Sequence, residues 1–163
     1  MQLVGRLTPT ATPADRLAAL LHAQRHLHAL GITAWQDALV GDFLGMDDPS
    51  QAYLTAARDG SLTARVVGAL WWDRERGAEQ IPELVEKRAA LSHGRFRAGS
   101  VKLMLDGVAE NGTAALLDPY LDRCGCTTAN RGKSFIDPAR LPEYVSRSMP
   151  ASSRARLLTH APW

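Results

Sequence analysis

Lys102 is the residue of this sequence with the clearest chemical requirement. It lies in the segment Gly99-Ser-Val-Lys-Leu-Met-Leu-Asp-Gly107, which is nearly all apolar and which we interpret as a strand ending in an Asp-Gly turn. A charged amine in such a strand is costly unless it is paired, modified or bound to a metal. Two interpretations stay open: an ion pair with Asp106 or another buried acid, or a carbamate that bridges two divalent metals and helps to activate water.

Other polar residues offer weaker candidates. Asp106 ends the expected strand, and active sites of barrel enzymes lie at that end of their strands. Asp37 lies close to the end of another expected strand, where it is a cap, an ion-pair partner or a site residue. His26 and His28 fall within an expected helix, where residues two apart point in different directions and cannot share a metal. His22 and His26 could share one, but no third ligand is evident nearby.

The sequence contains two cysteines, Cys124 and Cys126, separated by one glycine. Residues this close rarely form an unstrained disulfide, and two thiols alone do not make a zinc site. We expect two reduced loop thiols, with a redox or metal role as the alternative.

Three helix–strand pairs are expected to position these residues. In chain order they are a helix over 13–30, with Thr12 as its N-cap and a leucine stripe, a strand over 32–38, a helix over 51–58, a strand over 62–72, a helix over 81–91 and the lysine strand. The strands are apolar along their length, which predicts a parallel sheet covered on both faces. This order predicts α/β architecture, and the absence of glycine-rich phosphate motifs favours a (β/α) barrel.

The rest of the chain is less regular. A polar loop follows Tyr120, and a further helix is expected with Asp137 as N-cap and Pro138 in its first turn. A net charge of +2 over 163 residues gives no argument for nucleic acid as a partner. No apolar run is long enough to span a membrane, and the N-terminus lacks the layout of a signal peptide, so we expect a cytoplasmic protein.

Several segments together resemble amidohydrolase family 3, the metal-dependent hydrolases that include N-substituted formamide deformylase. The matching segments are residues 23–38, 101–107, 113–120 and 132–141, and the lysine strand is the most specific of them. The resemblance implies a (β/α)₈ barrel of the TIM type, of which residues 1–147 hold about three βα units. It also implies that Lys102 is the fourth-strand lysine, which many members carbamylate as a metal bridge. Asp106 and Trp35 would then line the substrate pocket, while Trp71 and Trp72 are expected in the core or pocket wall.

Several metal ligands and the general base of the family pattern are missing, and this determines the activity that we expect of the chain. The first-strand His-x-His, the histidines of the fifth and sixth strands and the general-base aspartate of the eighth strand are missing. We therefore assign no catalytic residue and expect this chain alone to show little activity and to bind no metal. The intact enzyme would use a divalent metal, with zinc expected, to hydrolyse a C–N bond in a small amide or formamide. The alternative is an inactive α/β interaction module in which Lys102 is dispensable.

Residues 148–163 form an irregular segment that is rich in Arg, Ser and Pro. The composition changes near Arg147, inside the expected helix. Our hypothesis is that the chain is truncated and that this tail is read in a foreign frame. Genomic DNA would test it, because another frame downstream should then encode a strand with His-x-His.

Overall fold

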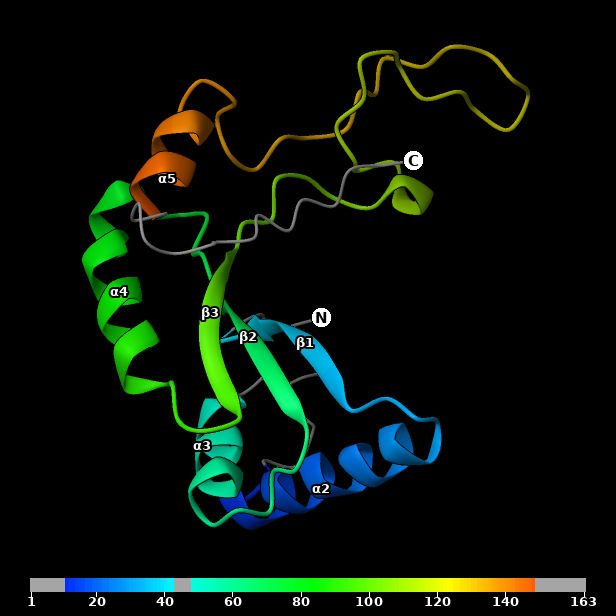
Figure 1. The fold of residues 1–163 in the computed structure, drawn as a ribbon. Coiled ribbons are helices and arrows are strands. Elements are labelled where there is room, and N and C mark those ends of the chain that lie inside the picture. The colour runs from blue at the N-terminus through cyan, green and yellow to red at the C-terminus, as the bar shows by residue number, and fades with distance from the viewer. Residues whose placement is uncertain (1–10, 43–47, 149–163) are drawn as a thin grey trace. The chain divides into compact units, whose positions relative to one another are not determined.

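A three-stranded parallel sheet in the order β1-β2-β3 is the central feature of the structure (Figure 1). This computed structural model describes residues 11–42 and 48–148. The described residues fall into two units. The sheet unit comprises those of Met1–Trp71 and Pro82–Lys102, and the loop unit comprises those of Trp72–Ile81 and Leu103–Trp163.

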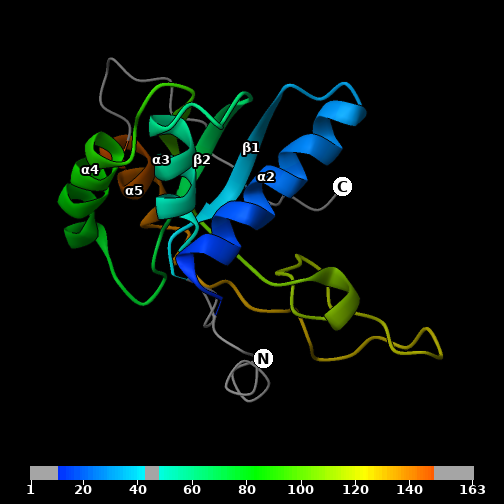
Figure 2. The same cartoon turned by 90° about the horizontal axis from the view of Figure 1, so that it is seen from below.

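Helices and strands alternate through the sheet unit. Its elements are α2 (Pro13–Ala29), β1 (Ala34–Val40), α3 (Ser50–Arg58), β2 (Arg65–Trp71), α4 (Ile81–Ala90, of which Ile81 belongs to the loop unit) and β3 (Phe96–Lys102). Helices α2 and α3 lie side by side (Figures 1 and 2), and α4 runs beside β3 (Figure 1), with a groove between them. Parallel pairing of all three strands confirms the predicted α/β class.

Helix α2 starts as the sequence predicts but packs differently. Thr12 and Asp15 form a reciprocal capping box, with Pro13 as the first helical residue. The predicted leucine stripe is only half-buried, and Leu30 at its end is 64% exposed. The buried residue of this helix is Gln24, whose side chain hydrogen-bonds the segment that leads into β2.

Within the sheet unit, the helices cover one face of the sheet. Val66 and Phe96 are fully buried on this face, and the Phe96 ring stacks on Tyr53 of α3 with the ring centroids 4.7 Å apart. On the opposite face Val67 is 41% exposed, and Arg97, its partner in register, is exposed as well. The prediction of cover on both faces is therefore wrong for the first half of the strands, whereas Ala69 and Ser100 further along this face are buried.

Strand pairing moves the strand boundaries away from the predicted ones. The lysine strand runs over Phe96–Lys102 instead of starting at Gly99 and continuing to Leu105. Lys102 pairs in register with Trp71, the last residue of β2, so Leu103 has no partner residue in β2. At the other edge, β1 begins at Ala34 because its partner Arg65 is the first residue of β2.

Strand β3 lies at the edge of the sheet, and its first half is covered by the turn before it. The amides and carbonyls of His93 and Phe96 exchange two hydrogen bonds, of 2.8 and 2.9 Å. The Ser92 hydroxyl accepts a bond of 3.2 Å from the Ala98 amide. These edge groups are thus satisfied within the chain.

The loop unit consists mainly of turns. Its helices are two short 3₁₀ turns, η1 (Ala78–Gln80) and η2 (Ala109–Asn111), and the α-helix α5 (Leu141–Ser148). Tyr144 of α5 packs against buried Trp72, with the ring centroids 4.8 Å apart.

Helix α5 begins later than predicted. The Asp137 side chain accepts from the Ala139 amide and its carbonyl accepts from the Arg140 amide, so Asp137 starts a turn that precedes the helix. The predicted tail, residues 148–163, lies outside the described residues except for Ser148. No helix in the described part of the chain has the length and apolar character needed to cross a membrane.

Candidate functional site

Lys102 lies at the carboxyl end of β3, on the face of the sheet that the helices leave open. Its partner in register is Trp71, and Ser100, two residues earlier on the same face, accepts a hydrogen bond of 3.0 Å from Gln36 of β1. Gln36 is adjacent to Val67 in register, which identifies this as the face opposite the helices, although Ser100 itself is buried. Lys102, Trp71, Ser100 and Gln36 therefore line one surface near the end of the strands where barrel enzymes place their active sites.

The Lys102 side chain is half-buried. Among the described residues of the sheet unit, none forms a hydrogen bond or an ion pair with its amine. The other two lysines differ, since Lys87 bonds the Glu83 carboxylate at 2.8 Å and Lys133 is exposed. Lys102 thus differs from the other two lysines in being half-buried with no partner for its amine in the described sheet unit.

Asp106 belongs to the loop unit, four residues beyond the end of β3. It forms an isolated antiparallel bridge with Ser134, and its carboxylate accepts a hydrogen bond of 3.0 Å from the Ala115 amide. The expectation that it ends the lysine strand is wrong, because the sheet stops at Lys102. In the structure Asp106 anchors the loop that follows.

Trp35 and Asp37 lie on the helix-covered face of β1. The Trp35 indole donates to the Tyr53 hydroxyl at 3.4 Å, and that hydroxyl donates to the Asp37 carboxylate at 2.8 Å. The other Asp37 oxygen accepts from the Leu39 amide at 3.0 Å, where the register of β1 shifts. Asp37 is therefore inside β1 rather than at its end. Sequence reasoning missed Tyr53, although its position on the apolar face of an expected helix was a usable signal.

Burial raises the pKa of Tyr53 above its ordinary value, and the Asp37 carboxylate adds to this rise, while the Trp35 hydrogen bond opposes it. A phenol with a raised pKa keeps its proton in the folded chain at a pH where the unfolded chain loses it. We expect stability to fall as pH rises above about 10, because the folded state then binds more protons than the unfolded state.

Tyr53→Phe should abolish this alkaline loss of stability. Urea denaturation on either side of about pH 10 measures the effect. Tyr120→Phe is the matched control, because the Tyr120 hydroxyl bonds the Ala114 carbonyl in the loop unit, far along the chain from Asp37. The explanation fails if Tyr53→Phe keeps the full alkaline slope of the wild type.

The remaining candidates do not form a metal site. His26 and His28 lie on α2 as expected, with His26 exposed and the His28 ring 3.4 Å from the Thr63 hydroxyl. Cys124 and Cys126 are free and exposed, which agrees with the expected reduced thiols. Within residues 11–42 and 48–148, no group of three or more His, Cys, Asp or Glu side chains could hold a metal ion.

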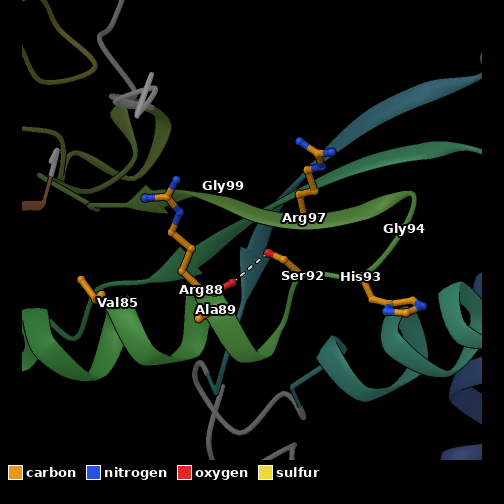
Figure 3. Close-up of a pocket in the computed structure, with 8 residues that line it drawn as sticks. All are labelled: Val85, Arg88, Ala89, Ser92, His93, Gly94, Arg97 and Gly99. Carbon is orange, nitrogen blue, oxygen red and sulfur yellow. Dashed lines mark hydrogen bonds between the residues drawn. The ribbon is translucent and has the colours of Figure 1, made fainter. Parts of the chain in front are cut away.

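A groove of about 660 Å³ lies between α4 and the edge of β3, lined by residues such as Val85, Arg88 and Gly99. Figure 3 shows that Arg88 reaches from α4 toward β3, whereas Arg97 extends from β3 away from α4. The two guanidinium groups therefore do not converge, and the groove shows no built anion site.

Comparisons with known proteins identify the fold and the family of the chain. No curated protein matches it. Two crystal structures resemble it, each with a TM-score of 0.63, and both are of uncharacterized metal-dependent hydrolases. The one from Pyrococcus horikoshii OT3 is 18% identical and the one from Pyrococcus furiosus is 23% identical. Each alignment covers 90% of this chain and 28% of the other protein, so the chain spans under a third of their length.

At this level of identity the two structures establish the fold, which is a fragment of the barrel-like fold of such hydrolases. The family profile gives the closer assignment, because it matches residues 1–161. The chain belongs to the amidohydrolase family.

Proposed function

We propose that Lys102 of this chain is a ligand of the metal centre in an amidohydrolase that hydrolyses the C–N bond of small amides or formamides. The observation that carries the proposal is the position of Lys102. It is the last residue of a parallel strand, it faces the side of the sheet opposite the helices, and its amine has no partner among the described residues of the sheet unit. The N-substituted formamide deformylases remain the proposed subtype.

Lys102 would act as a carbamate. The ammonium group first loses one proton. The neutral amine then attacks carbon dioxide, an N–C bond forms as one C–O π bond opens, and a second proton leaves the nitrogen, so that a cationic side chain becomes a carboxylate-like ligand. When bound, a divalent metal, with zinc as the expected ion, supplies Lewis acidity and an activated water. Catalytic zinc needs three protein ligands, and the described residues offer no such group. The described residues therefore do not fit a complete metal site.

The two residues proposed for the substrate pocket would contribute differently. Asp106 would act through the loop that it anchors by its bond to the Ala115 amide. Trp35 would contribute to the pocket indirectly, by helping to position β1. Its neighbour in this strand, Gln36, lies on the face that carries Lys102. The role of Asp106 rests on the family resemblance and on this anchoring position, whereas that of Trp35 rests on the resemblance alone, because Trp35 lies on the helix-covered face, opposite Lys102.

Carbamylation of Lys102 is the direct test. The full chain in ¹³C-labelled bicarbonate should give a ¹³C carbamate resonance that disappears in Lys102→Arg. The Lys133→Arg variant is the matched control and should retain the resonance, because Lys133 is exposed in the loop unit. A resonance that survives Lys102→Arg would refute the proposed role of this lysine.

Metal content and activity of the full chain test the wider expectation. We expect little turnover of amides or formamides and no stoichiometric zinc, because the described residues lack a group of three ligands. Stoichiometric zinc with turnover would contradict this expectation. The alternative function, a non-catalytic interaction module, instead predicts a cooperative monomer that no substitution of Lys102 affects.

A further inference from the structure

Residues 120–128 form a hairpin whose tip carries both cysteines of the sequence. The Thr128 amide donates to the Tyr120 carbonyl at 2.9 Å, and Leu121 bridges Thr127. At the tip, the Asp122 amide donates to the Cys126 carbonyl at 2.9 Å. The chain is therefore closed on itself on both sides of Cys124 and Cys126.

The Asp122 carboxylate holds the two cysteines together. One of its oxygens, Oδ1, accepts from the Cys124 amide at 2.8 Å and from the Cys126 amide at 2.9 Å. Because both amides bind the same atom, the two residues cannot move apart while these bonds last. Gly125 between them has a φ of 78°, which suits glycine and folds the tip back.

The two thiols are free, exposed and the only ones in the sequence. A disulfide needs a Cα separation of about 4.4–6.8 Å. Residues two apart lie within about 7 Å even when extended, and the folded tip brings them closer. A disulfide between Cys124 and Cys126 is therefore sterically possible, but the ring that it closes contains only one intervening residue and is strained. Strained, exposed disulfides are the easily reduced ones.

We propose that Cys124 and Cys126 form a reversible redox pair that exchanges with small disulfides of the glutathione disulfide class. The thiolate of one cysteine attacks the small disulfide, forms a mixed disulfide and releases one small thiol. The thiolate of the other cysteine attacks the protein sulfur of this mixed disulfide and expels the second thiol. The protein loses two electrons and two protons, and the small disulfide is reduced to two thiols. Excess thiol reverses both steps.

Intact mass after treatment with glutathione disulfide tests the pair in the full chain. The wild type should lose two hydrogen atoms and retain no glutathione, and dithiothreitol should restore the original mass. Cys124→Ser and Cys126→Ser should each retain one glutathione, because the second thiol is missing. A wild type that carries two glutathiones, or that forms only disulfide-linked dimers, would overturn the proposal.

Asp122→Ala tests whether the shared oxygen positions the thiols. We expect slower ring closure and accumulation of the mixed disulfide in this variant. Asp137→Ala is the matched control, because Asp137 also accepts a backbone amide, that of Ala139 at 2.9 Å, in a turn without cysteines. Ring closure at the wild-type rate in Asp122→Ala would show that the carboxylate does not prepare the pair.

Discussion

Replacing Gln24 with alanine is expected to lower the free energy of unfolding by about 3 kcal/mol. The Gln24 side chain is only 6% exposed, and its amide nitrogen donates to the Ser61 carbonyl at 3.0 Å. Its oxygen accepts from the amides of Thr63 and Ala64, at 2.9 and 3.1 Å. The substitution leaves these backbone groups without partners, and Ala64 is fully buried. Urea denaturation followed by circular dichroism measures the loss.

Two further variants test whether lost hydrogen bonds, rather than lost packing or a change in the helix, explain the expected destabilisation by Gln24→Ala. Arg25→Ala changes the exposed neighbour in the same helix and should alter stability by no more than about 0.5 kcal/mol. Gln24→Met keeps the length of the side chain but removes its hydrogen bonds, so it should remain clearly destabilised. Wild-type stability in Gln24→Met would mean that packing, rather than hydrogen bonding, explains the role of Gln24.

Gly132→Ala should disrupt the loop unit, with a local cost of about 3 kcal/mol. Gly132 has a φ of 72°, and a Cβ placed there would overlap the Ala114 carbonyl. The backbone next to it is paired, because the Leu116 amide donates to the Arg131 carbonyl and the Lys133 amide donates to the Thr113 carbonyl. Hydrogen exchange of these two amides should become about a hundredfold faster, which is the equivalent of this cost.

Gly125→Ala provides the matched control for Gly132→Ala. Gly125 has a similar φ of 78°, but a Cβ there would meet no atom within 4 Å. It therefore carries only the cost of a left-handed backbone, about 1–2 kcal/mol. Equal effects of the two variants on exchange at Leu116 and Lys133 would show that the overlap with Ala114 is unimportant.

The sequence predicted the order of helices and strands correctly, because helix caps and apolar segments are visible within each short stretch of the chain. Thr12 and Pro13 identify the start of α2, and the three apolar segments identify the parallel strands. The exact strand ends could not be predicted, because they depend on pairing. Lys102 ends β3 since its partner Trp71 ends β2, and no local signal in the lysine strand reveals that limit.

The site was predictable only in part, for a similar reason. The apolar setting of Lys102 led to the prediction of a metal-site role, which stays a prediction, and the structure shows that Lys102 pairs with Trp71 at the end of β3. The buried role of Gln24 could not be predicted, because its partners Ser61, Thr63 and Ala64 lie far along the chain. Asp106 looked like the end of a strand because its apolar neighbours resemble β3, although they lie beyond the last paired residue.

The bonds from Ser92 and His93 to the start of β3 also affect how copies of this chain can meet. An open sheet edge normally acts as a template on which another chain nucleates growth of the sheet. Here the Phe96 and Ala98 amides are already bonded to His93 and Ser92, so a second copy cannot add a strand along this stretch. The turn that begins the lysine strand thus also stops the sheet from extending into a fibre from its first half.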